Sequence, residues 1–133
     1  MKKLLPFLLI TTIAVFSCRK PSEVPSLTSI ITQGTWYVNL MKDNGVNNTS
    51  AYTGWQFTFK TDKVATVTDG VTNYTGSWRE DSTRQKFILT INSPEIELIH
   101  ISQEWDISLK TYGRVIFKDD KLNPAQELQF TKF

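Results

Sequence analysis

Residues that could catalyse a reaction are scarce in this chain. His100 is the only histidine and Cys18 the only cysteine among 133 residues. His100 stands between apolar residues, where a sole histidine is more typical of a packed or rim residue than of a catalyst. The sequence has no second histidine for a transition-metal site and no G-x-S-x-G nucleophile elbow. We therefore expect the protein not to be an enzyme.

Two groups of oxygen-bearing side chains are the remaining candidates for chemistry. Glu95 and Glu97 would share one face of a strand and could act as acid and base, but solvated charges at a sheet edge explain them more simply. Asp119, Asp120 and Asn123 offer oxygen ligands for calcium, yet they lack the glycine and the terminal glutamate of a calcium-binding loop. The sequence therefore predicts neither a metal nor a cofactor.

Cys18 has a different chemistry, which follows from the residues before it. Two lysines precede a thirteen-residue apolar run, Leu4 to Phe16, which is too short to span a bilayer and is typical of an export signal. The stretch Val15-Phe16-Ser17-Cys18 resembles a bacterial lipobox. That resemblance implies cleavage after a signal peptide of residues 1–17. It also implies acylation of Cys18 by fatty acids such as palmitate.

The segment after the cysteine reads as a tether. Residues 18–26 contain two prolines and no hydrophobic period, so they would hold a domain of residues 27–133 away from a membrane. Arg19 is not the aspartate that resembles an inner-membrane retention signal, which favours the outer membrane. Without Lys2 and Lys3, the 15 basic residues become 13 and equal the 13 acidic ones. A neutral domain has no electrostatic footprint for nucleic acid, so we exclude that partner.

The elements that position the side chains of the domain are mostly strands. Residues 27–33 have helical spacing between Ser26 and Gly34, which predicts a short helix. From Trp36 onward, apolar and polar residues alternate, as in strands with one buried face. The clearest strands are expected at 55–59, 86–91, 105–110 and 128–131, and weaker ones at 64–69, 74–80, 96–101 and 114–118.

These strands are separated by short turns and by no long amphipathic helix, so neighbours should be antiparallel. Eight or nine short strands in one domain leave a sandwich or a closed barrel. The longest interruption, residues 42–54, is rich in Asn, Gly, Ser and Thr, and we expect a flexible loop or lid there.

The order of these features resembles a known family. A short helix leads into Gly34-Thr35-Trp36, a meander of aromatic-rich strands follows, and the chain ends in Leu128-Gln129-Phe130-Thr131-Lys132. Residues 27–133 thereby resemble the lipocalin-like domains of small lipoproteins from Bacteroidota-type bacteria. The resemblance implies an all-β, antiparallel, up-and-down barrel. In it, Trp36 would close one end beneath a basic side chain, either Lys132 or Arg114.

The aromatic side chains leave two functions open. In an eight-stranded barrel they fill the interior or line a cavity for one small ligand. In the first function, an envelope lipoprotein binds a small hydrophobic ligand through Trp55, Phe57, Phe59 and Trp78. In the alternative, a barrel with a solid core is an accessory or inhibitor module that binds another envelope protein. Its sign would be an exposed apolar patch that includes Tyr37, Tyr52 or Tyr112.

Overall fold

The structure is a computed structural model that describes residues 24–119, 121 and 125–133 of the chain. Cys18, the predicted signal (1–17) and most of the predicted tether (18–26) lie outside these residues. Asp120 and Asn123 of the calcium hypothesis also lie outside them. Within the described part, a short helix precedes an antiparallel barrel, which confirms the predicted fold class.

The barrel consists of strands that follow one another in chain order. The helical segments are α1 (Leu27–Ile31), the 3-10 turn η1 (Thr49–Tyr52) and α2 (Ile96–Ile101). The strands are β1 (Trp36–Asp43), β2 (Val46–Asn47), β3 (Gln56–Phe59), β4 (Val64–Thr68), β5 (Asn73–Asp81), β6 (Lys86–Ile91), β7 (Glu104–Lys110), β8 (Arg114–Asp119) and β9 (Gln126–Lys132).

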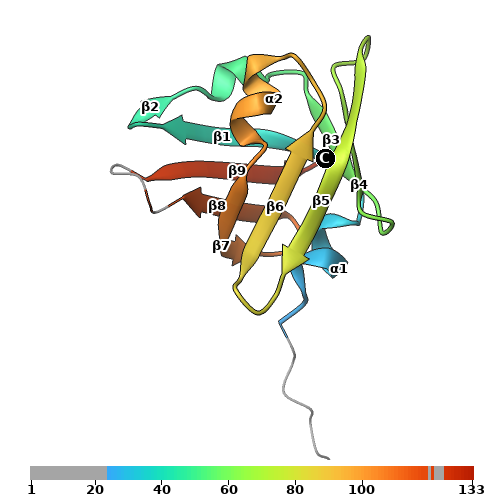
Figure 1. Cartoon of the computed structure of the whole chain (residues 1–133), viewed down its shortest axis with the longest axis vertical. Helices are drawn as coiled ribbons and strands as arrows, with labels where there is room; N and C mark the ends of the chain where they lie inside the picture. Colours follow the sequence, from blue (N-terminus) through green and yellow to red (C-terminus); the bar gives the residue numbers. More distant parts are fainter. Residues whose placement is uncertain (1–23, 120, 122–124) are drawn as a thin grey trace, which may run out of the picture.

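The sheet closes because its last strand returns to its first. From β3 to β9 each strand pairs with the next one, and β9 then pairs with β1 from Trp36↔Lys132 to Lys42↔Glu127. The short strand β2 only forms a hairpin with the end of β1. In Figure 1, β5 and β6 cross at a steep angle to β1, β8 and β9. Closure leaves few free strand edges, which stabilises a meander of short strands.

Aromatic rings fill the interior of the barrel. The side chains that are at most 1% exposed include Trp36, Phe57, Phe59, Trp78, Phe87, Trp105, Phe117 and Phe130. Phe59 alone has ring contacts with Trp78, Phe87 and Phe130, with centroids 5.7–6.0 Å apart. The alternation of the sequence thus produces a packed core, and burial of this aromatic surface is the main source of stability.

Helix α1 closes one end of the barrel. Its N-cap is Ser26, as predicted, whose hydroxyl accepts a hydrogen bond from the Ser29 N–H at 3.1 Å. The Glu80 carboxylate on β5 accepts three more, from the N–H groups of Leu27 and Thr28 and from the Thr28 hydroxyl. The buried face of α1, with Leu27 at 0% exposure, covers the core.

The strand predicted at 96–101 is wrong, because this segment forms α2. Leu98 and Ile101 are three residues apart and fully buried, whereas Ile96 and Ile99 are exposed. A spacing of three residues fits one face of a helix, and the same residues also fit an imperfect strand alternation. The secondary structure of such a short apolar run is therefore ambiguous from its sequence. The helix covers the end of the barrel opposite α1, where Figure 1 shows it next to the upper ends of β6 and β7.

The prediction of a flexible loop at 42–54 is also wrong in part. The segment contains the end of β1, then β2 and η1, and its Tyr52 side chain is only 3% exposed. The hydroxyl of Tyr52 donates a hydrogen bond to the Glu97 carbonyl oxygen at 2.9 Å. A single buried aromatic residue therefore fixes this polar segment against α2.

Candidate functional site

The wall of the barrel opens where β1 meets β3. These strands share one registered pair, Trp36↔Phe57, whereas β3 and β4 share four, from Gln56↔Thr68 to Phe59↔Ala65. Beyond Trp36, β1 follows β9, and the chain before Phe57 turns away toward η1. We call the resulting opening the seam cleft.

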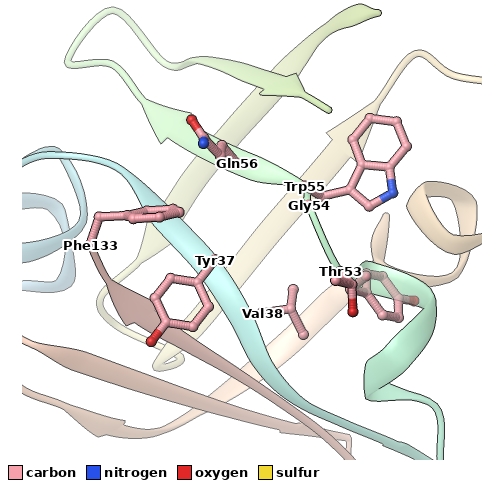
Figure 2. A pocket seen from close by; sticks show the side chains of 8 residues that line it. Tyr37, Val38, Thr53, Gly54, Trp55, Gln56 and Phe133 are labelled. Atoms are coloured by element: carbon pink, nitrogen blue, oxygen red, sulfur yellow. The ribbon is translucent and has the colours of Figure 1, made fainter. Parts of the chain in front are cut away.

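The seam cleft has about 330 Å³ of space, and half of its lining residues are aromatic. Its lining residues are Tyr37, Val38, Tyr52, Thr53, Gly54, Trp55, Gln56 and Phe133. In Figure 2, Tyr37 and Phe133 stand on one side of it and Trp55 on the other, with Val38 between them. This volume falls at the lower end of the range of small-molecule sites.

Ring contacts hold both walls in place. Tyr37 meets Phe133 edge to face with centroids 5.0 Å apart, and Trp55 packs against Tyr74 at 5.9 Å. The Tyr74 hydroxyl in turn donates a hydrogen bond to the Glu95 carboxylate at 3.2 Å. Burial, and next the hydrogen bond to Glu95, raises the pKa of Tyr74 above its ordinary alkaline value, so the phenol is neutral at physiological pH with or without the shift. The walls are thus preformed and uncharged.

Val38 lies at the seam cleft, beside the ladder between β1 and β9. The Phe133 N–H donates to the Thr35 carbonyl oxygen at 3.0 Å, so Thr35 turns its polar groups toward β9. In an antiparallel ladder such pairs alternate, and Tyr37 opposite Thr131 is the next pair of that kind. By this alternation the N–H and C=O of Val38, the last regular pair before a bulge between Val38 and Leu40, lie on the side of β1 that faces away from β9.

The structure brings one of the four predicted ligand-binding residues to this cleft. Trp55 is half-buried and lines it, whereas Phe57, Phe59 and Trp78 are at most 1% exposed within the aromatic core. The Trp78 indole N–H donates to the Lys60 carbonyl oxygen, which also fixes that ring. Alternation identifies inward-facing residues, but it cannot distinguish a filled interior from a hollow one.

Gly34 and Trp36 hold the closed end of the barrel. Trp36 is 0% exposed, and its indole N–H donates to the Ile31 carbonyl oxygen at the end of α1. Gly34 has a φ of +80°, and a Cβ there would lie 2.7 Å from the Lys132 Cε. Of the two basic residues considered, Lys132 is the one that lies opposite Trp36, whereas Arg114 pairs with Thr131.

Some residues of the cleft carry a sequence signal for a different function, and others carry none. Tyr37 and Tyr52 were expected only in an exposed patch, yet both line the seam cleft. Tyr112, the third member of that expected patch, is 56% exposed and does not line the cleft. Phe133 has no periodic context, and only the pairing of β1 with β9 brings it beside Tyr37.

The candidate carboxylates and the histidine lie in two places, at α2 and at the end of β8. Glu95 precedes α2, Glu97 and His100 lie on it, and Asp119 ends β8. Within residues 24–119, 121 and 125–133, no group of three or more His, Cys, Asp or Glu side chains could hold a metal ion. None of the helices in that part of the chain is long and apolar enough to cross a membrane.

Comparison with known proteins supports the fold. No protein-family model matches the chain, and no curated protein matches it either. The crystal structure of a DUF4847 family protein from Bacteroides vulgatus ATCC 8482 is similar, with a TM-score of 0.62 over 81% of this chain and 98% of that chain. Because the sequence identity is 14%, the likeness concerns the fold. This neighbour comes from a Bacteroidota bacterium, in keeping with the resemblance noted in the sequence.

Proposed function

We propose that this protein is a non-enzymatic, lipid-anchored envelope protein with a lipocalin-like barrel, which binds a small, flat, mostly apolar molecule in the seam cleft. The observation that carries the proposal is the contrast between a filled barrel interior and an open cleft with aromatic walls. The ligand therefore binds at the side of the barrel, between β1 and β3.

The chemistry of the walls defines the ligand class. Tyr37, Trp55 and Phe133 offer ring faces and edges to an aromatic or fused-ring molecule. The N–H and C=O of Val38 favour a ligand with a hydrogen-bonding edge. A mostly apolar pocket with a few fixed polar groups is the usual arrangement in small-molecule sites.

Binding can be measured with N-phenylnaphthylamine, an uncharged dye whose emission rises in apolar surroundings. A soluble form that begins at residue 24 should bind it saturably. We expect Trp55→Ala to weaken binding by about 1.4 kcal/mol, a tenfold rise in Kd, because one wall of the cleft is lost.

Two control variants separate the cleft from the rest of the molecule. Tyr112→Ala removes an aromatic side chain that is 56% exposed and does not line the cleft, so the Kd should not change. Phe59→Leu should lower the free energy of unfolding by about 1–3 kcal/mol and leave the Kd unchanged, because Phe59 belongs to the core. Absence of saturable binding, or an equal Kd for Trp55→Ala, would overturn the proposal.

A second function rests on the exposed apolar side chains of α2. Ile96 is 61% and Ile99 is 52% exposed, at the barrel end opposite α1. An accessory module could bind another envelope protein there. A photo-crosslinking residue at Ile99 should then capture one specific envelope protein, and Ile96→Ser should abolish the crosslink. Crosslinks that are unspecific or insensitive to Ile96→Ser would argue against this function.

A further inference from the structure

A second cavity lies beside α2 and shares one lining residue, Tyr52, with the seam cleft. It has about 220 Å³ of space, and its lining residues are Met41, Asn48, Ala51, Tyr52, Ile96, Glu97 and His100. These residues come from the end of β1, from the segment around η1 and from α2. We propose that this cavity binds a small organic cation, an alkyl- or arylammonium ion.

The cavity has an apolar part that suits the body of such an ion. Met41 is 1% and Tyr52 is 3% exposed, so the thioether and the ring form a fixed inner wall. Ala51 and the exposed Ile96 extend the apolar surface toward solvent. Since the Tyr52 hydroxyl already donates to the Glu97 carbonyl oxygen, the orientation of the ring is fixed. An aromatic face in a partly dehydrated cavity attracts ammonium groups.

The polar part of the cavity is negative. Glu97 is its acidic lining residue, and none of the lining residues is a lysine or an arginine. No hydrogen bond or ion pair with the residues that the structure describes engages the Glu97 carboxylate, whereas Asp43 accepts a hydrogen bond from Gln126. Glu97 is therefore the carboxylate that is available to an incoming positive charge.

The environment of the Tyr52 hydroxyl is consistent with a negative electrostatic potential in the cavity. Burial raises the pKa of Tyr52 most, and the nearby carboxylates Glu97 and Asp43 raise it further. Both carboxylates therefore act on the same buried group from neighbouring elements. An anion would meet the same repulsion, whereas a cation would be attracted.

His100 provides a specific reporter for the cavity, because it is the only histidine of the chain and lines the site. The full chain in phosphatidylcholine nanodiscs, with histidine isotope-labelled at Cε1, is titrated with phenylethylammonium and with its neutral analogue phenylethanol. The His100 resonance should shift saturably with the ammonium ion. The Kd for phenylethanol, read from the same resonance, should be about tenfold higher than the Kd for phenylethylammonium. Added salt should weaken the binding of the ammonium ion.

Glu97→Gln is the decisive variant, because it removes the charge and keeps the main-chain oxygen that Tyr52 binds. We expect a Kd for phenylethylammonium about tenfold higher, with an unchanged urea midpoint of unfolding. Glu95→Gln removes an equal charge two residues away, outside the cavity lining, and should change the Kd less than twofold.

Equal affinity for the ammonium ion and the alcohol, or equal losses in the two glutamine variants, would overturn the proposal. Binding of N-phenylnaphthylamine to the seam cleft should be the same in Glu97→Gln as in the wild type. The two sites can therefore fail or succeed separately.

Discussion

Tyr52 lines both cavities, and it is held on both sides by contacts that the sequence does not reveal. Its ring belongs to the hydrophobic core, while its hydroxyl reaches the main chain of α2 across 45 residues. Because a buried phenolate would lose solvation next to two carboxylates, the folded chain favours the protonated form. This preference has a measurable effect on stability at alkaline pH.

We predict that the free energy of unfolding decreases as the pH rises above about 10, the usual pKa of an unfolded tyrosine. In that range the unfolded chain releases a proton that folded Tyr52 retains, so unfolding is favoured by about 1.4 kcal/mol per pH unit. Below that pH both states are protonated, and the contribution to stability is fully present. Urea midpoints measured across this range test the slope.

Tyr52→Phe should reduce the alkaline slope, because it removes one group whose protonation differs between the folded and unfolded states. Tyr74 also has a raised pKa and adds to the slope in the same direction, so Tyr74→Phe serves as the matched comparison. If Tyr52→Phe and the wild type lose stability in parallel, another group is responsible.

At the scale of elements, the strands were predictable and the second helix was not. A strand such as β6 has strict alternation, with Phe87, Leu89 and Ile91 buried. Burial of one face of the sheet is sufficient to explain that pattern. In α2, Leu98 and Ile101 satisfy a helical period, but the competing alternation in the same six residues hides it. The helix forms because these two side chains cover the barrel end, which is a tertiary effect.

The seam cleft was only partly predictable for a related reason. The sequence identifies Trp55 because this aromatic residue adjoins the long segment 42–54, whereas Tyr37 gains its place from the single pair between β1 and β3. The number of ladder pairs between two strands depends on how the closed barrel staggers its strands. No local pattern in the sequence encodes that stagger.

The attachment of α1 gives a prediction at this scale. Glu80→Ala removes the acceptor of three hydrogen bonds at the N-terminus of a five-residue helix. A single hydrogen bond to a charged group contributes about 1.5–3 kcal/mol. The three bonds share one carboxylate, so we expect the free energy of unfolding to decrease by at least this amount. Urea denaturation measures the loss, and hydrogen exchange should show faster exchange of the Leu27 and Thr28 amides.

Ser26→Ala on the same helix provides the comparison, because it removes only the N-cap bond and should cost about 1 kcal/mol. A smaller effect of Glu80→Ala than of Ser26→Ala would show that the carboxylate does not fix the helix.

At the scale of the whole molecule, the two ends of the barrel have different surroundings. The described chain enters at α1, and α2 with its exposed Ile96 and Ile99 lies at the opposite end. The second cavity therefore lies at the barrel end opposite the one where the described chain enters.

We predict that Cys18 carries acyl chains. Cells supplied with an alkyne analogue of palmitate should label the chain and retain it in the outer-membrane fraction, because two or more acyl chains give stable anchoring. Cys18→Ser should be unlabelled and should keep its signal segment. Labelling that persists in Cys18→Ser, or a wild-type chain that is unlabelled, would contradict the prediction.

The four tryptophans of the chain differ in a way that has a practical consequence. The indole N–H groups of Trp36, Trp78 and Trp105 donate to carbonyl oxygens of the main chain, and all three rings are at most 1% exposed. Trp55 is the half-buried one. Acrylamide should therefore quench a single, red-shifted component of the tryptophan emission, that of Trp55. Because Trp55 lines the seam cleft, this component should report ligand binding there without any added label.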